Sequence, residues 1–218
     1  MSLYQEKDRQ YFSWARTELI NLVEGRDNII LEIGCGEGET GLELKKQGKA
    51  KEVVGIELVP KAAAEAAKKL DKVISGDIEK IDLPFPEEYF DYIIAGDVLE
   101  HLYDPWECLK KLRKYLKPGG WVVASIPNIA HWRVLKDLIL KDKWEYVQAG
   151  TLDRTHLRFF TKKGIKELFV RSGFEVIHLS KVPSARVAAR LVDKLTLRML
   201  ERFLAFQYLV CARKYASH

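Results

Sequence analysis

The sequence predicts an α/β fold in which helices cover both faces of a doubly wound, mostly parallel sheet. Short apolar runs alternate with polar stretches of helical character from residue 29 to residue 126, the pattern of consecutive strand–helix–strand units. The first run breaks into three glycines at alternate positions, as at a tight strand-to-helix turn. A chain of 218 residues, 47% of them apolar, is typical of one globular domain, and we expect residues 1–218 to form it.

An amphipathic segment at residues 5–23 predicts a helix over the ligand pocket, so residues 1–27 form an N-terminal helical cap in this interpretation. A polar helix is expected at 39–47, directly after the glycines. The first five strands are expected where apolar runs are bounded by turn residues, at 29–33, 53–57, 73–78, 90–95 and 121–126.

The helix after the fourth strand has the clearest start. Asp104 is a typical N-cap residue, Pro105 suits the first turn, and Glu107 would complete a capping box. The helix should end near residue 116, because the Pro-Gly-Gly sequence at 118–120 predicts a turn into the fifth strand.

Residues 128–158 are long for a strand-to-helix connection and rich in aromatic side chains. We interpret them as an inserted helix and loop that form a lid beside the substrate. A helix at 161–171 and strands at 174–178 and 207–213 follow. Between those strands, apolar and basic residues each recur every four positions and predict a basic helix inserted at 184–205.

The net charge of +5 is carried by the end of the chain, since residues 181–218 hold eight lysines and arginines against two acids. We interpret the basic helix at 184–205 first as a helix that packs on the core and exposes its basic face to solvent. A dimer contact, an anionic lipid surface and an acidic polymer are the functional alternatives. The sequence therefore leaves monomer and homodimer open.

The composition also indicates where in the cell the protein is expected. No apolar run reaches eighteen residues, so no transmembrane segment is expected, and the first thirty residues lack the apolar core of a signal peptide. Cys35, Cys108 and Cys211 are odd in number and scattered, which is typical of reduced thiols. We expect a cytoplasmic protein.

Three kinds of ligand loop compete for the glycine-rich turn. A phosphate-binding P-loop needs Gly-Lys-Ser/Thr at the helix start, and none is present. The dinucleotide fingerprint needs a glycine at the sixth position from Gly34, where Glu39 stands. An acid ahead of the glycines, Glu32, suits a cationic ligand better than a phosphate.

The pattern Glu-x-Gly-x-Gly-x-Gly at residues 32–38 resembles motif I of the class I S-adenosylmethionine (SAM) methyltransferases. The resemblance extends over residues 28–180 and implies a Rossmann-like methyltransferase sheet of seven strands with an antiparallel last strand at 207–213. It also implies SAM as cofactor and S-adenosylhomocysteine as product. The cofactor positions carried over by motif are Glu32, Gly34, Cys35, Gly36, Gly38, Glu57, Leu58, Asp77, Ile78 and Asp97.

The resemblance also assigns roles within this set. Glu57 ends the second strand and would accept hydrogen bonds from a ribose diol. Asp77 would meet the adenine amino group, and Ile78 would pack on the ring. Cys35 is interpreted as a small residue that fits the loop and not as a redox group.

The chemistry should lie beyond the carboxyl ends of strands four and five, as in other open parallel sheets. Methyl transfer requires a positioned nucleophile and removal of its proton. The catalytic candidates are Asp97, His101, His131 and His156, and His101 is favoured as a base because imidazole titrates near neutral pH.

Asp97, Glu100 and His101 form an acid-x-x-Glu-His segment that resembles two groups of enzymes. One comprises quinone-biosynthesis O-methyltransferases, and the other methylates the 2′-hydroxyl at small-RNA 3′ ends. In the RNA group two acids and two histidines hold a divalent metal, which implies Asp97, Glu100, His101 and His156 here, with Asp97 replacing that group's glutamate. Such clusters are also common structural networks, so we predict no metal.

The sequence thus supports three hypotheses. The first is methyl transfer to a hydroxyl of a small-molecule acceptor. The second is a metal-dependent RNA 3′-terminal 2′-O-methyltransferase. The third is a non-catalytic SAM-binding partner protein.

Overall fold

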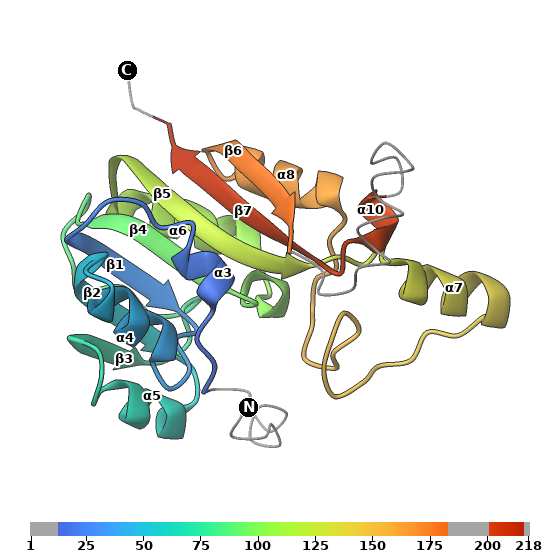
Figure 1. Ribbon diagram of the computed structural model, residues 1–218, viewed down its shortest axis with the longest axis horizontal. Helices are drawn as coiled ribbons and strands as arrows, with labels where there is room; N and C mark the ends of the chain where they lie inside the picture. The colour runs from blue at the N-terminus through green and yellow to red at the C-terminus, as the bar shows by residue number, and fades with distance from the viewer. Residues whose placement is uncertain (1–12, 183–200, 216–218) are drawn as a thin grey trace.

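The computed structural model describes residues 13–182 and 201–215, which fold around a seven-stranded sheet of order β3-β2-β1-β4-β5-β7-β6 (Figure 1). The first five strands pair in parallel, whereas β7 is antiparallel to both β5 and β6. The predicted doubly wound, mostly parallel sheet with an antiparallel last strand is confirmed. The strands are β1 (Asn28–Ile33), β2 (Ala50–Glu57), β3 (Lys72–Ser75), β4 (Phe90–Gly96), β5 (Leu116–Pro127), β6 (Phe174–Lys181) and β7 (Gln207–Lys214).

Helices lie on both faces of this sheet. Helices α3, α4 and α5 cover one face, and α6 and α8 cover the other (Figure 1). A short 3₁₀ turn, η1, follows β4. The helical elements are α3 (Thr17–Ile20), α4 (Glu39–Lys46), α5 (Pro60–Ala66), η1 (Leu99–His101), α6 (Pro105–Tyr115), α7 (Trp132–Lys141), α8 (Lys162–Arg171) and α10 (Glu201–Leu204).

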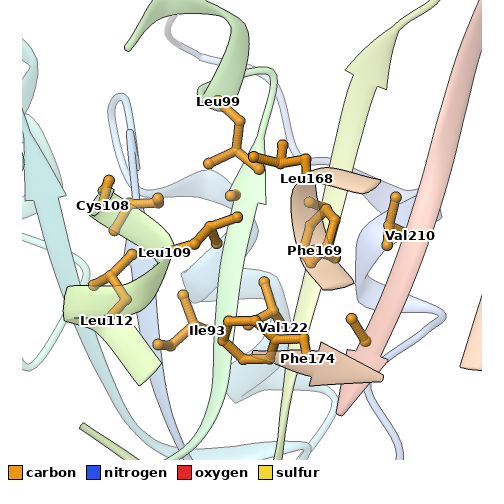
Figure 2. Packing of buried hydrophobic residues seen from close by; sticks show 14 of the residues in the cluster. Ile93, Leu99, Cys108, Leu109, Leu112, Val122, Leu168, Phe169, Phe174 and Val210 are labelled. Atoms are coloured by element: carbon orange, nitrogen blue, oxygen red, sulfur yellow. The ribbon is translucent and has the colours of Figure 1, made fainter. Parts of the chain in front are cut away.

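Side chains that alternate along the interior strand β1 contribute to the hydrophobic cores on both faces of the sheet. Ile30 joins the cluster beneath α3 and α4, whereas Leu31 and Ile33 join the cluster beneath α6 and α8. Burying each such side chain contributes about 2 kcal/mol, so the sheet is a firm support for the loops at its edge. Figure 2 shows the second cluster, which includes Ile93, Leu109, Leu112, Val122 and Phe169.

The N-terminal segment is less helical than the sequence predicts. Residues 5–12 lie outside the described residues, residues 13–16 lack regular structure, and α3 begins only at Thr17. The backbone N–H of Arg16 donates to the Thr40 hydroxyl at 3.1 Å. This contact with α4 holds the chain before Thr17 against the sheet in a non-helical path.

Several strand boundaries also differ from the prediction: β2 begins at Ala50 and not at 53, and β6 ends at Lys181 and not at 178. β3 ends at Ser75, since the Asp77 carboxylate accepts from the Glu79 N–H and starts a turn. β5 begins at Leu116, directly after α6, and takes in the Pro-Gly-Gly sequence predicted as a separate turn. A register shift between Phe90 and Tyr92 of β4 accommodates that sequence within the strand pair.

The start of α6 shows half of the predicted capping box. The Asp104 carboxylate accepts from the Glu107 N–H at 3.0 Å, and Pro105 occupies the first turn. The Asp104 N–H, however, donates to Glu79 at 2.7 Å and not to Glu107. The cap is therefore completed by a residue from the loop after β3, which ties α6 to the carboxyl edge of the sheet.

The chain after β5 leaves the sheet. In Figure 1, α7 extends beyond the end of β5, and irregular chain returns from it to α8. Of the basic helix predicted at 184–205, residues 184–200 lie outside the described part, and residues 201–204 form α10. Among the helices of residues 13–182 and 201–215, none combines the length and apolar character needed to cross a bilayer.

Candidate active site

A cavity of about 290 Å³ lies at the carboxyl ends of β1, β2 and β4. The strand order reverses between β1 and β4, and this switch point is where open parallel sheets leave a crevice for ligands. Every cofactor position predicted from the sequence except Gly38 lines the cavity: Glu32, Gly34, Cys35, Gly36, Glu57, Leu58, Asp77, Ile78 and Asp97.

The glycine-rich turn folds tightly over the end of β2. The N–H groups of Gly34 and Cys35 both donate to the Ile56 carbonyl, at 2.8 and 3.1 Å. Gly34 has φ 65°, and a Cβ added there would lie 2.5 Å from Cγ2 of Val98. Only glycine both adopts this positive φ readily and fits beside Val98, so the turn leaves its backbone open toward the cavity.

Two residues of the turn support it from behind. Gly38 has φ 84°, is the N-cap residue of α4, and would place a Cβ 3.2 Å from the backbone of Ala66. The Cys35 side chain is buried against Gly55 of β2, and burial raises the pKa of its thiol. Both positions therefore shape the turn through packing.

Glu57 joins the turn to the second strand. Its carboxylate accepts from the Gly36 N–H at 2.9 Å and from the Val59 N–H at 2.8 Å. Burial raises the pKa of Glu57, and the backbone N–H groups of Val59 and Gly36 oppose that rise. One buried acid thus holds two loops of the cavity wall and still presents lone pairs to a ligand's hydroxyl donors.

Glu32 lies beneath the turn as a buried acid. Burial raises the pKa of its carboxyl to about 8, and hydrogen bonds from the Thr40 hydroxyl and the Gly41 N–H only partly oppose this. Its Oε2 atom has no hydrogen-bond partner. A buried acceptor of this kind favours a cation or a donor beside it, so the residues fit a cationic cofactor such as SAM.

Asp77 and Ile78 form the wall after β3. Ile78 is buried, and Asp77 is half-buried with its carboxylate 2.8 Å from Lys80 Nζ. Burial by itself would raise the pKa of Asp77, but the hydrogen bonds from Lys80 and the Glu79 N–H outweigh it and lower that pKa. This pair offers an ionised acceptor next to an apolar surface.

Asp97 is held from three directions. Its backbone adopts φ 55°, uncommon for a residue with a side chain. The carboxylate forms an ion pair with Arg16 at 2.5 Å and accepts from the Ser125 hydroxyl at 3.0 Å and from the Gln207 amide. Asp97 therefore lines the cavity as a fixed acceptor that joins the N-terminal segment to β5 and β7.

His101 lies at the cavity wall and His156 directly behind it. Their rings are 4.6 Å apart, and Nδ1 of each lies about 3 Å from a backbone carbonyl, that of Thr155 for His101 and that of Thr151 for His156. Because a carbonyl only accepts, each Nδ1 carries a proton, and the basic lone pair of each neutral ring is on Nε2.

Glu100 completes a group with these histidines that we call the Glu100 cluster: Glu100, His101 and His156. One ligand atom from each lies within 4.8 Å of the others. Both carboxylate oxygens of Glu100 are buried without a hydrogen-bond partner, and burial, followed by the charge of Asp97, raises its pKa well above the usual range. The donor set fits a divalent cation, but Asp97 is engaged elsewhere.

His131 does not line the cavity. It is the N-cap residue of α7, and its ring packs 5.6 Å from that of Phe206. Burial, and the nearby charge of Arg133, lower its pKa. Among the four catalytic candidates, the structure brings Asp97 and His101 to the cavity, places His156 behind His101, and leaves His131 beside Phe206.

The sequence analysis missed the residues that hold Asp97. Arg16 and Trp14 come from the N-terminal segment and line the cavity, and Gln207 begins β7. Leu157, from the chain before α8, also lines it. No motif marks these positions, because each reaches the cavity only through the folding of a distant segment.

Comparison with known proteins agrees with this geometry. Residues 4–179 match the family model described as a methyltransferase domain. The chain belongs to this methyltransferase family. As a member it is a SAM-dependent methyltransferase, with SAM as cofactor and S-adenosylhomocysteine as product, which favours an enzyme over the non-catalytic partner.

Among curated relatives of this methyltransferase, the demethylmenaquinone methyltransferase of Oceanobacillus iheyensis is 24% identical over 192 residues, 78% of this chain and 79% of that protein. The corresponding enzyme of Staphylococcus carnosus is 24% identical over 201 residues, 84% and 82% of the two chains. An uncharacterised methyltransferase of Schizosaccharomyces pombe is 33% identical over 120 residues, 50% and 43% of the two chains.

Solved structures share the fold of the methyltransferase. A SAM-dependent methyltransferase from Archaeoglobus fulgidus superposes with a TM-score of 0.65 at 21% identity, covering 97% and 98% of the two chains. One from Mesorhizobium loti gives 0.64 at 20% identity, covering 93% and 99%. The [4+2]-cyclase SpnF gives 0.63 at 19% identity, covering 97% and 86%, so the acceptor must be argued from the site and not from the fold.

Proposed function

We propose that this enzyme transfers a methyl group to a hydroxyl of a small, ring-bearing acceptor. The observation that supports this most directly is His101, an imidazole at the wall of the cavity whose Nδ1 contacts a carbonyl. The apolar side chains of Trp14 and Leu157, both largely exposed, line the same cavity and would suit a ring. The relatives named for demethylmenaquinone also point to a small ring molecule as acceptor.

The cofactor would be held by the acids and glycines of the cavity wall. When bound, SAM supplies an electrophilic methyl group on a positively charged sulfur. Glu32 would balance cationic charge of the cofactor, and Glu57 would accept from its ribose hydroxyls. Asp77 would accept from the adenine amino group, with Ile78 against the ring.

For methyl transfer from SAM, the protein needs mainly to position the acceptor and to supply a base that removes its proton. His101 would take the acceptor's proton at Nε2, since hydrogen bonding to Thr155 keeps the proton of the neutral ring on Nδ1. Asp97 would orient the acceptor through its fixed carboxylate. All three cysteines are free, which supports a cytoplasmic location as part of this proposal.

Cofactor affinity should depend on pH through Glu32. Burial raises its pKa to about 8, so that the carboxyl is mostly protonated at pH 7 before a ligand binds. A cation beside it lowers that pKa, so binding releases a proton and affinity rises with pH up to about 8, by at most tenfold per pH unit. Calorimetry in buffers of different ionisation enthalpy measures this release.

The matched control is Glu32→Gln, which keeps the shape and the Thr40 contact but cannot titrate. The cofactor's own amino group also titrates near pH 8, and the variant retains that contribution. Equal proton release by the wild type and Glu32→Gln would show that Glu32 is not next to the bound cation.

The Glu100 cluster favours a second candidate function, metal-dependent methylation of an RNA 3′-terminal 2′-hydroxyl. Its carboxylate without hydrogen-bond partners and its two imidazoles with Nδ1 on carbonyls suit a divalent ion. Such an ion would orient two adjacent hydroxyls and lower the pKa of one of them. The engagement of Asp97 by Arg16 weighs against this candidate.

One experiment separates the two functions. Purified enzyme is given SAM with a labelled methyl group and either hydroxylated quinones and catechols or a short oligoribonucleotide, each with and without chelator. Label in the ring acceptors, unaffected by chelator, supports the first function. Label in the oligonucleotide that is lost with chelator or high salt supports the second, and Glu100→Gln should then abolish Mn²⁺ binding in a titration.

A further inference from the structure

The segment after β5 exposes more apolar surface than any packing role explains. We call residues 132–149 the α7 arm. Ile139 and Leu140 are 73% and 75% exposed, whereas Val134 is its only buried residue. Contiguous exposed apolar side chains of this size mark interaction surfaces. Those in the arm are Trp132, Leu138, Ile139, Leu140, Trp144, Tyr146 and Val147.

The helical period of α7 gathers four of its apolar side chains on one side, whereas Leu140, four residues after Lys136, lies with the basic residues. Trp132, Leu135 and Ile139 are spaced i, i+3, i+7 and share one side, with Leu138 beside them. Basic residues border it: the charged groups of Lys136 and Arg133 lie 5.5 and 5.7 Å from the Trp132 ring. The helix carries three cations, Arg133, Lys136 and Lys141, against one acid, Asp137.

We propose that the α7 arm docks on the surface of a lipid bilayer that carries anionic headgroups. An apolar side bordered by lysine and arginine is the composition of helices that lie in the membrane interface. Tryptophan and tyrosine favour that interface because one end of each ring system is apolar and the other polar. The excess of cations on α7 complements negative headgroups.

The position of the arm fits this partner. The chain that returns from it packs through Phe159, whose ring lies 5.5 Å from that of Trp144 and 6.4 Å from that of His156. Leu157, two residues before Phe159, lines the cavity. A bilayer on the arm would therefore lie near the part of the cavity wall that Leu157 forms, whatever the acceptor is. This docking is independent of the proposed function.

The test is co-sedimentation of the full chain with vesicles. Vesicles of equal parts phosphatidylcholine and phosphatidylserine should bind the protein at least tenfold more strongly than vesicles of phosphatidylcholine alone. Leu138→Ser with Ile139→Ser should lower binding to the anionic vesicles roughly tenfold, because both side chains of the apolar side lose apolar burial. Lys136→Gln with Lys141→Gln should have a similar effect, confined to anionic vesicles.

A matched control keeps the result specific to the arm. Val170→Ser with Ile177→Ser changes two exposed apolar residues outside the arm, 46% and 52% exposed, on α8 and β6, and should leave binding unchanged. Thermal unfolding of each variant checks folding. Failure to bind anionic vesicles, or equal loss in the control, overturns the proposal. A dimer in light scattering that Ile139→Ser dissociates, without vesicle binding, assigns the surface to a second copy instead.

Discussion

Replacing Glu57 with alanine is expected to weaken S-adenosylhomocysteine binding by at least about a hundredfold. The substitution removes the acceptor for two backbone donors, the N–H groups of Gly36 and Val59. Each hydrogen bond to a charged group contributes about 1.5–3 kcal/mol, and leaving the donors unpaired adds to the loss. The glycine-rich turn and the loop after β2 then lose their common support, and the proposed ribose contact disappears with them.

Two further variants test whether the loss of affinity comes from the Glu57 carboxylate itself. Glu57→Gln keeps one oxygen acceptor but turns an amide NH₂ toward one of the two donors, so an intermediate loss of about tenfold is expected. Glu52→Ala removes an acid of the same strand whose carboxylate accepts from the Tyr89 hydroxyl, and it should leave affinity unchanged. Calorimetric titration of all three measures the effect. Normal affinity in Glu57→Ala would refute the assignment of this carboxylate to the cofactor.

Replacing Gly34 with alanine should have a comparable effect through shape alone. The added Cβ would meet Val98 Cγ2 at 2.5 Å, and φ 65° costs roughly 1 kcal/mol for a residue with a side chain. We expect the turn to shift, cofactor affinity to fall about a hundredfold, and thermal stability to drop by several degrees. The turn is anchored to Ile56 by two hydrogen bonds, so it cannot move without losing them.

The clash and the backbone strain can be separated. Gly34→Ala combined with Val98→Ala relieves the contact but not the left-handed φ, so binding should recover only in part. Gly164→Ala serves as control: this glycine lies in α8, has no positive φ, and would place its Cβ at ordinary distances of 3.6 Å or more. Complete recovery in the double variant would show that Val98 alone, and not the turn's conformation, requires glycine at position 34.

The Glu100 cluster depends both on residues that are adjacent in the chain and on contacts between distant segments. Glu100 and His101 are adjacent in the chain, and the sequence pattern singled them out together with His156 and Asp97. The structure brings three of the four together. It takes Asp97 out of that group, because Arg16 and Gln207, which are 191 residues apart in the chain, both bind its carboxylate. No local pattern predicts such a contact.

The lid hypothesis shows the same limit. The aromatic composition of residues 128–158 predicted an inserted helix and loop, and α7 with its returning chain is present. Only Leu157 of that segment reaches the cavity wall, while most of the α7 arm is exposed. Composition reports that a segment is apolar, but which surface it covers depends on where the sheet directs it.

By itself, the sequence determined the alternation of strands and helices, the glycine turn and the acids at the strand ends. These features depend on residues close together in the chain, through backbone conformation, side-chain period and helix capping. The tertiary structure alone decided that Arg16, Ser125 and Gln207 hold Asp97, that Glu79 completes the cap of α6, and that Gly38 shapes the turn without lining the cavity. Those contacts join distant segments, whose approach is set by how the helices pack on the two faces of the sheet.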